Sequence, residues 1–237
     1  AQFGLSPDFF SQQAHLQAPA AGGLLAAIPG LQIGVVTQLE EDPEGEERIK
    51  VKLPIISADE EGIWARLATL DAGNNRGTVF RPEVDDEVIV GFVQGDPRDA
   101  VILGMLHSSA KPSPIPATAD NHEKGIISRS EVKILFDDEK SSLLFETPGG
   151  NQVLISDDEG GITLADQHGN KIILDSDGIA LESAADLSIT SSTGDVKIEG
   201  MNIEHAANTQ FKAEGSAGLE ISSSAITVVK GSLVQIN

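Results

Sequence analysis

The residues that could do chemistry are few, and their spacing argues against a catalytic or metal centre within one chain. The five histidines lie far apart, and none has the spacing of a ligand pair: His15, His107, His122, His168 and His205. His205 is expected to be a solvent-facing polar residue. The alternative is a place on a threefold axis, where three copies would meet and could bind an ion or a water. We therefore expect no cofactor and no metal site.

The acidic and hydroxyl residues favour a similar conclusion. Asp137-Asp138 and Asp157-Asp158-Glu159 could serve as glycosidase carboxylates or as calcium ligands. Neither group has the Gly-x-Asp spacing of calcium-binding repeats, and both fall at predicted strand ends and turns, which favours solvated corner charges. Ser222 to Ser224 supply hydroxyls without a histidine or a Gly-x-Ser-x-Gly context. No catalytic residue is predicted, and we expect the chain not to be an enzyme.

The composition excludes further classes of protein. The 237 residues carry a formal charge of -21, which argues against a nucleic-acid partner because phosphate binding needs clustered Lys and Arg. Aromatic residues are 4% of the chain, with no Tyr and one Trp. The absence of Cys excludes disulfides and thiolate sites and fits assembly in a reducing cytoplasm. No apolar run approaches the roughly 18 residues of a membrane span.

The elements that must position these residues are defined by a repeat in the second half of the chain. From about residue 151, apolar residues occur in pairs one residue apart, and the pairs recur about every eight residues. A spacing of two puts both side chains on one face of an extended strand. Gly-containing turn formers separate the pairs. The series is Val153/Ile155, Ile162/Leu164, Ile172/Leu174, Ile179/Leu181, Leu187/Ile189, Val196/Ile198, Met201/Ile203, Phe211, Leu219/Ile221, Ile226/Val228 and Val234/Ile236.

This period is too short for one chain to close on itself. Two branched side chains bury too little apolar area to offset the entropy of ordering eight residues. Three chains wound around one axis would bury every pair and would give each strand hydrogen-bonding neighbours in other chains. We therefore predict an intertwined trimeric β-helix, or β-prism, over residues 131–237. The alternative is a set of hairpins in a β-sandwich.

Residues 31–108 have the pattern of a compact OB-type barrel. Five short strands with turn signals between them are expected at 32–37, 48–53, 64–68, 87–93 and 100–106, and helical patterning is absent. Residues 1–30 are expected to form an extended arm. Residues 109–130, with Pro112, Pro114 and Pro116, are expected to form a semi-rigid linker. The predicted fold is thus all-β.

The barrel also carries a resemblance. The segments 62–66, 77–92 and 95–104 are similar to the OB domain of central spike proteins of contractile injection machines. This family comprises the VgrG proteins of type VI secretion, the hub spikes of contractile phage tails and the spikes of extracellular contractile injection systems. Segments 132–138, 149–155 and 169–175 resemble the start of its triple-stranded β-helix. The OB motif residues are Trp64, Arg66, Pro82, Gly95, Asp96, Pro97 and Gly104.

Three family features are expected to be missing from this chain. Members with a large tail-hub ring usually place it before the barrel, where about thirty residues stand here. The resemblance therefore implies a shorter spike or a missing hub region. Short phage spikes can end in a His-x-His that binds iron, and this ending lacks it. A lysozyme-like insertion, known in some phage spikes, has no room in the linker.

The resemblance implies a mechanical function. A homotrimeric spike, assembled in the cytoplasm of a bacterium as part of a phage-tail-like particle, would be driven through a target envelope and meet its membrane only transiently. Tube and baseplate proteins would contact the OB end. A PAAR-like tip protein would bind Leu233, Val234, Gln235, Ile236 and Asn237. The alternative is a trimeric β-helical tailspike enzyme that degrades a surface polysaccharide, although residues 131–237 carry neither Tyr nor Arg.

Overall fold

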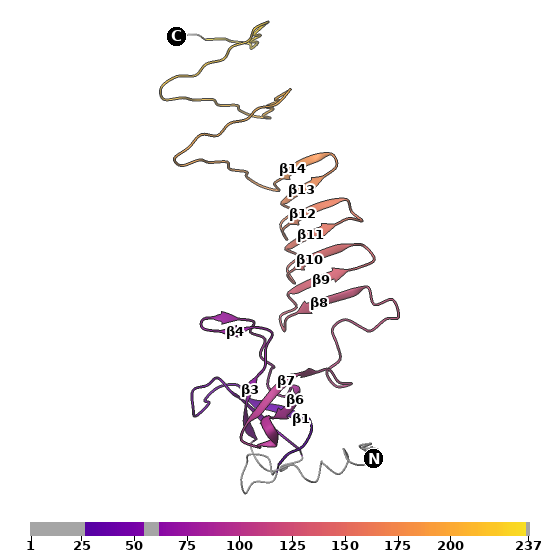
Figure 1. Ribbon diagram of the computed structural model, residues 1–237. Coiled ribbons are helices and arrows are strands. Elements are labelled where there is room, and N and C mark those ends of the chain that lie inside the picture. Colours follow the sequence, from indigo (N-terminus) through magenta and orange to yellow (C-terminus); the bar gives the residue numbers. More distant parts are fainter. Residues whose placement is uncertain (1–26, 55–61, 236–237) are drawn as a thin grey trace, which may run out of the picture. The chain divides into compact units, whose positions relative to one another are not determined.

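A computed structural model describes residues 27–54 and 62–235 (Figure 1). Most of the predicted arm at 1–30 therefore lies outside the described residues. Apart from one short 3-10 turn, η1 (Val93–Gly95), the regular structure in these ranges is β-strand. Within them, no helix is long and apolar enough to cross a membrane. The all-β prediction is confirmed.

Five strands close into a barrel. They run in the order β1-β2-β3-β7-β6, and every neighbouring pair is antiparallel except the parallel pair β3 and β7. This is the order of an OB-fold, in agreement with the expected barrel. Its strands are β1 (Gln32–Gln38), β2 (Ile49–Lys52), β3 (Ile63–Leu67), β6 (Glu87–Phe92) and β7 (Ala100–Leu106). A small hairpin, β4 (Ala72–Gly73) and β5 (Arg76–Gly77), lies between β3 and β6 in sequence.

The barrel contains the hydrophobic core of the described chain. Alternate residues of its strands point inward, as the period of an extended strand requires. Gly34 is buried in β1, and a Cβ there would lie 2.3 Å from Val51 Cγ1, so only glycine lets these two strands approach so closely. The core residues are Val36, Ile49, Val51, Leu53, Ala65, Val88, Val90, Ala100 and Ile102.

A second sheet of seven strands follows the barrel in sequence. Its strands hydrogen-bond in chain order, each antiparallel to the next, as a continuous meander (Figure 1). They are β8 (Glu123–Ile127), β9 (Lys133–Asp137), β10 (Ser142–Glu146), β11 (Gln152–Ser156), β12 (Gly161–Ala165), β13 (Lys171–Asp175) and β14 (Gly178–Glu182).

This sheet corrects two expectations. The strands of 123–182 find their hydrogen-bonding neighbours within their own chain, whereas we predicted neighbours in other chains. The sheet also begins at Glu123, inside the segment 109–130 that was predicted to be a linker. Both differences have one cause: tight turns return the chain on itself, so consecutive strands pair before a second chain is needed.

Asp and Gly build the tight turns of the meander. Gly169 has a φ of 92°, a left-handed conformation that favours glycine, and its N–H donates to the carbonyl of Asp166. The Asp166 carboxylate also accepts the backbone N–H groups of His168 (2.8 Å) and Asn170 (2.9 Å). Gly160, with a φ of 72°, completes the same kind of turn after Asp157.

Residues 183–235 have a different local structure. Throughout this range, all of which the structure describes, no residue belongs to a strand or helix. The chain follows an extended path that bends at regular intervals (Figure 1). The bends fall at 184–185, 192–194, 201, 208–209, 216–217, 224–225 and 232. Their spacing of about eight residues is the period of the apolar repeat in the sequence. Met201, which we had paired with Ile203 on one face, instead lies at a bend.

The barrel core gives a direct test of the fold. Ile102 is fully buried, so Ile102→Ala should lower the free energy of unfolding of the barrel by about 2 to 5 kcal/mol. Urea denaturation followed by the fluorescence of Trp64, the one Trp of the chain, measures this loss. The neighbouring Leu103 is half exposed, so Leu103→Ala is the control and should cost clearly less. Equal losses would contradict the assignment of this core.

Candidate functional site

One face of the seven-stranded sheet is apolar from β9 to β14, and in β8 it carries Ile126 and Lys124. The register of the strands aligns two rows of branched or aromatic side chains on this face. We call it the apolar face. One row is Ile126, Ile134, Phe145, Val153, Leu164, Ile172 and Leu181; the other is Phe136, Leu143, Ile155, Ile162, Leu174 and Ile179.

The opposite face of the sheet is mixed. Its central row holds Leu135, Leu144, Leu154, Thr163, Ile173 and Ala180, and polar residues such as Lys133, Glu146 and Gln152 flank this row. Across β9 and β10, Lys133 Nζ pairs with Glu146 Oε2 at 2.8 Å, and this ion pair raises the pKa of Lys133. The apolar face is therefore suited to burial against other apolar side chains, and the charged flanks of the opposite face are suited to contact with water.

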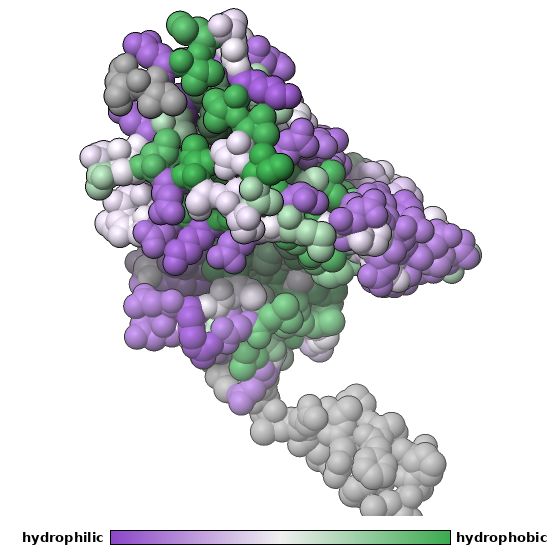
Figure 2. Space-filling view, turned by 90° about the horizontal axis from the view of Figure 1, so that it is seen from above, coloured by the Kyte–Doolittle hydropathy of each residue, from purple (hydrophilic) through white to green (hydrophobic). Residues whose placement is uncertain are grey.

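A single chain leaves the apolar face uncovered. Phe136, Phe145 and Ile155 are each more than two fifths exposed, and Ile179 is 72% exposed. Large exposed hydrophobic areas appear beside hydrophilic ones in the space-filling view (Figure 2). Contiguous apolar area of this kind marks a surface that another protein covers.

The segment 183–235 is still more open. Every residue in it is exposed, including Leu187, Ile198 and Phe211. Between residues 185 and 234, all of them described, the structure has no backbone-to-backbone hydrogen bond. Extended backbone with unpaired N–H and C=O groups and exposed apolar pairs needs strands from elsewhere to complete it.

The Gly-Asp-Pro motif of the barrel forms a charged turn. Asp96 is buried and accepts three hydrogen bonds from Arg98: from its backbone N–H (3.0 Å), from Nε (3.0 Å) and from Nη2 (2.7 Å). The Arg98 guanidinium, with the backbone N–H, lowers the pKa of Asp96 to about 2. Gly95 has a φ of 75°, which the turn requires before Asp96.

The barrel contains a second charged turn, at residues 42–48, which was not predicted from the sequence. Asp42 accepts the backbone N–H groups of Glu44 (3.2 Å), Glu46 (2.8 Å) and Arg48 (3.1 Å). The Arg48 Nη2 lies 2.6 Å from Asp42 Oδ1, and this side-chain bond holds the pKa of Asp42 well below its ordinary value. An arginine at the end of an acidic run is the signal that could have found it.

Three of the OB motif residues meet beside these two turns. Trp64, Arg66 and Asp96 line a surface pocket of about 550 Å³ together with Glu44, Glu46, Arg48, Arg98, Asp99 and Ala100. Lys50 Nζ lies 5.7 Å from the centroid of the Trp64 ring, a cation–π distance.

The other motif residues lie in the barrel frame. Pro82 is buried before β6, and Pro97 follows Asp96 in the turn. Gly104 lies in β7 opposite Ile89, where the register with β6 shifts. These positions set the backbone geometry of the barrel.

The predicted tip-binding residues are open where the structure describes them. Leu233 is 81% exposed and Val234 is 50% exposed. Gln235 is also exposed, whereas Ile236 and Asn237 lie outside the described residues.

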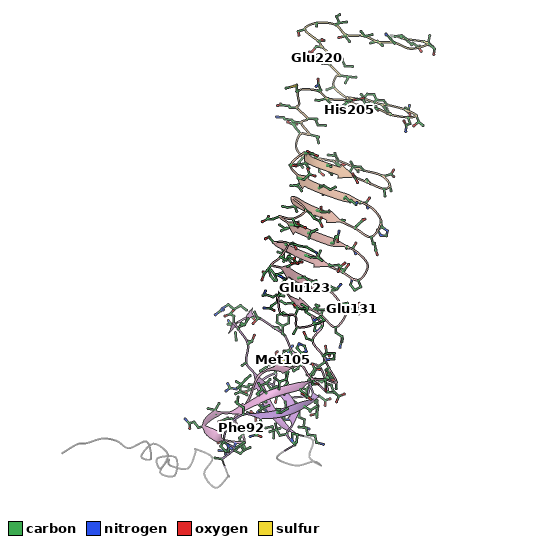
Figure 3. All side chains as sticks on the ribbon, turned by 90° about the vertical axis from the view of Figure 1, so that its right-hand side faces the viewer. Phe92, Met105, Glu123, Glu131, His205 and Glu220 are labelled. Carbon is green, nitrogen blue, oxygen red and sulfur yellow. The ribbon has the colours of Figure 1, made fainter. Side chains whose placement is uncertain are left out.

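The Asp137-Asp138 pair is engaged in local structure. The Asp137 carboxylate accepts the backbone N–H groups of Glu139 (3.0 Å) and Lys140 (3.1 Å) in a turn, and Asp138 pairs with the Lys124 ammonium. Among the described residues of one chain, no group of three His, Cys, Asp or Glu side chains could hold a metal ion. His205 is exposed, and its ring centroid lies 6.0 Å from that of Phe211 (Figure 3).

Comparison with known families identifies both parts of the chain. Residues 32–107 match the type VI secretion system and phage-baseplate injector OB domain. Residues 142–237 match the phage baseplate V C-terminal trimerisation domain. The chain belongs to this baseplate spike family. The resemblance drawn from the sequence is thereby confirmed. Strands β10 to β14 of the apolar face lie within the residues that match the trimerisation domain.

Curated relatives in this spike family are about 30% identical to this chain over the aligned residues. The chain is 29% identical to the type VI secretion system spike protein VgrG1c of Pseudomonas aeruginosa, over 50% of this chain and 18% of the relative. It is 30% identical to the spike protein VgrG3 of Vibrio cholerae, over 53% and 14%. It is also 30% identical to the actin cross-linking toxin VgrG1 of Vibrio cholerae, over 38% and 9%. The chain spans less than a fifth of the length of these relatives.

The Asp96–Arg98 turn predicts how the barrel responds to acid. Because the pKa of Asp96 is lowered to about 2 in the folded chain, its carboxylate stabilises the fold above its ordinary pKa, near 4. That stabilisation should be lost as the pH falls from about 4 to about 2. Asp96→Asn should therefore show a smaller loss of thermal stability over this range than the wild type, measured by Trp64 fluorescence.

The exposed neighbour Asp99 gives the control. Asp99→Asn should keep the acid response of the wild type, because Asp96 and Arg98 are still bonded. If Asp96→Asn and Asp99→Asn respond alike, the turn is not the source of the effect.

Proposed function

We propose that this chain is the trimeric central spike of a contractile injection system, and that its function is mechanical. Contraction of a sheath would drive a tube and this spike forward, so that the spike breaches the envelope of a target cell. Producing cells would assemble it in the cytoplasm as part of a phage-tail-like particle. The spike end would meet the target membrane only during the injection event.

The observation that carries this proposal is the uncovered apolar face together with the segment 183–235. Three apolar faces turned toward a common axis would bury the rows that one chain leaves exposed, such as Phe145, Leu164 and Ile179. The extended stretches of 183–235 would supply one another with strand partners across chains. The match of residues 142–237 to a trimerisation domain supports this arrangement.

Such an arrangement suits axial load. In the proposed prism, each stretch of 183–235 is hydrogen-bonded to other chains, so no subdomain can unfold without breaking contacts between chains. Separating one chain would expose apolar side chains and backbone groups of all three at once. A needle of this kind transmits force along its length.

The two ends of the spike would contact different partners. We assign tube and baseplate proteins to the OB barrel because residues 32–107 match the injector OB domain. We assign a cone-shaped PAAR-type tip protein to Leu233–Asn237, where exposed apolar residues such as Leu233 and Val234 would form a surface for it to cover. The strong negative charge keeps such a rod soluble and excludes a nucleic-acid partner from the proposal.

We further propose that the chain itself is not an enzyme. Two of the acidic residues that could have served a glycosidase are engaged elsewhere, since Asp137 caps a turn and Asp138 pairs with Lys124. The relative named as an actin cross-linking toxin matches over 9% of its own length. Incubation of the pure chain with capsular polymers and a reducing-end assay tests this point, and sugar release would contradict it.

The apolar face predicts a paired result in native mass measurements. Leu164 lies on the apolar face and Thr163 on the opposite face of the same strand. Leu164→Glu should disrupt the trimer, because three buried carboxylates would lose their hydration without partners. Thr163→Glu, which adds the same charge to the outer face, should leave a trimer. A wild-type chain that is monomeric, or two variants with the same mass, would contradict the proposed architecture.

The tip assignment predicts a selective loss of binding. Removal of 233–237 should leave the native mass trimeric but lower retention of a PAAR-type protein about tenfold or more in a pull-down. Met201→Ser, a change at an exposed bend, is the control and should leave retention unchanged. Equal retention by both variants would place the tip protein elsewhere.

A further inference from the structure

The bends of the segment 183–235 define equivalent positions in successive turns of the repeat. Six consecutive stretches between bends are each six residues long: 186–191, 195–200, 202–207, 210–215, 218–223 and 226–231. In extended chain, the second and fourth residues of a stretch share one face. In the sixth stretch the apolar pair Ile226/Val228 takes the first and third places instead. In the first five stretches, we call the second and fourth residues the inner positions. They are Leu187/Ile189, Val196/Ile198, Ile203/His205, Phe211/Ala213 and Leu219/Ile221.

His205 is the one polar residue in this set of inner positions. The other nine are apolar, and eight of them are large or branched. The sequence alone had paired Ile203 with Met201, which left His205 outside the pattern. Because Met201 lies at a bend, the partner of Ile203 on the same face is His205. His205 therefore occupies the place that isoleucine holds in three of the other stretches.

The neighbouring side chains agree with an inward imidazole. The ring of Phe211, itself at an inner position, has its centroid 6.0 Å from that of His205 at an interplanar angle of 30°. Ala213, the fourth residue of the next stretch, is the smallest residue among the inner positions. A short side chain there leaves room beside an imidazole, as Ile or Leu would not.

We infer that three His205 side chains, one from each chain, form a binding site for a divalent transition-metal ion on the threefold axis of the spike. This inference rests on the proposed trimer, because one chain supplies only one imidazole. Three neutral imidazoles are a common ligand set for zinc and cobalt, and a water completes a tetrahedron. The ion would satisfy the nitrogens of a polar ring buried among apolar side chains, and it would tie the three chains together at this level.

The test uses the full chain without a polyhistidine tag. The protein is incubated with Zn²⁺ or Co²⁺ and dialysed, its native mass is measured, and bound metal is quantified by mass spectrometry. The wild-type trimer should retain about one ion per three chains, and Co²⁺ should give the visible absorption of tetrahedral coordination. His205→Gln should remain a trimer and lose this ion. His168→Gln, which changes an exposed turn of the sheet, should keep it.

A third variant tests the inward position itself. His205→Ile should abolish metal binding and leave a trimer at least as heat-resistant as the metal-free wild type, since an apolar residue suits an inner position. A trimeric wild type that binds no more metal than His205→Gln would overturn the metal site and leave the proposed spike standing. A wild type with the mass of one chain would instead overturn the proposed function, and the site with it.

Discussion

The structure depends on apolar burial that one chain begins and does not complete. The barrel closes on its own core, where Val36, Val90 and Ile102 are fully buried. Beyond it, the same kind of residue lies uncovered, first along a whole face of the sheet and then along every stretch of 183–235. The hydrophobic effect is non-directional, so it drives these surfaces together but does not select their partners. In this chain the strand register and the bends make that selection.

Much of the fold could be predicted from the residues. Alternation of apolar residues located the five barrel strands, and the eight-residue period located the repeat. The pairing of 123–182 within one chain could not be predicted, because pairs of apolar residues at this spacing fit hairpins and interwound strands equally well. The difference lies in the connections. Gly160 and Gly169 adopt left-handed conformations in turns that are capped by the Ser156 hydroxyl and the Asp166 carboxylate. The bends after Glu182 are not followed by a returning strand.

The candidate sites were predicted less completely. The Gly-Asp-Pro motif identified Asp96 in the sequence. Asp42 belongs to a run of acidic residues, and only the three-dimensional structure shows that Asp42 and Glu44 are the members that pair with Arg48. The place of His205 depended on a single bend. If Met201 and Ile203 are taken as the apolar pair, the imidazole of His205 falls outside the pattern. Because residue 201 lies at a bend, the pair on one face is Ile203 and His205, and the imidazole lies on the apolar side.

The meander of 123–182 has a consequence for the order of events during synthesis. Its contacts join residues that are close along the chain, and such local contacts form quickly. In the proposed trimer, each nascent polypeptide would complete these seven strands alone, before it meets the other two chains. Three preformed sheets of residues 123–182 would then bring the first residues of the three 183–235 segments together. The slow step would be the choice of register among three identical repetitive segments, residues 183–235 of each chain. With one end of each segment fixed, pairing would proceed progressively from that end.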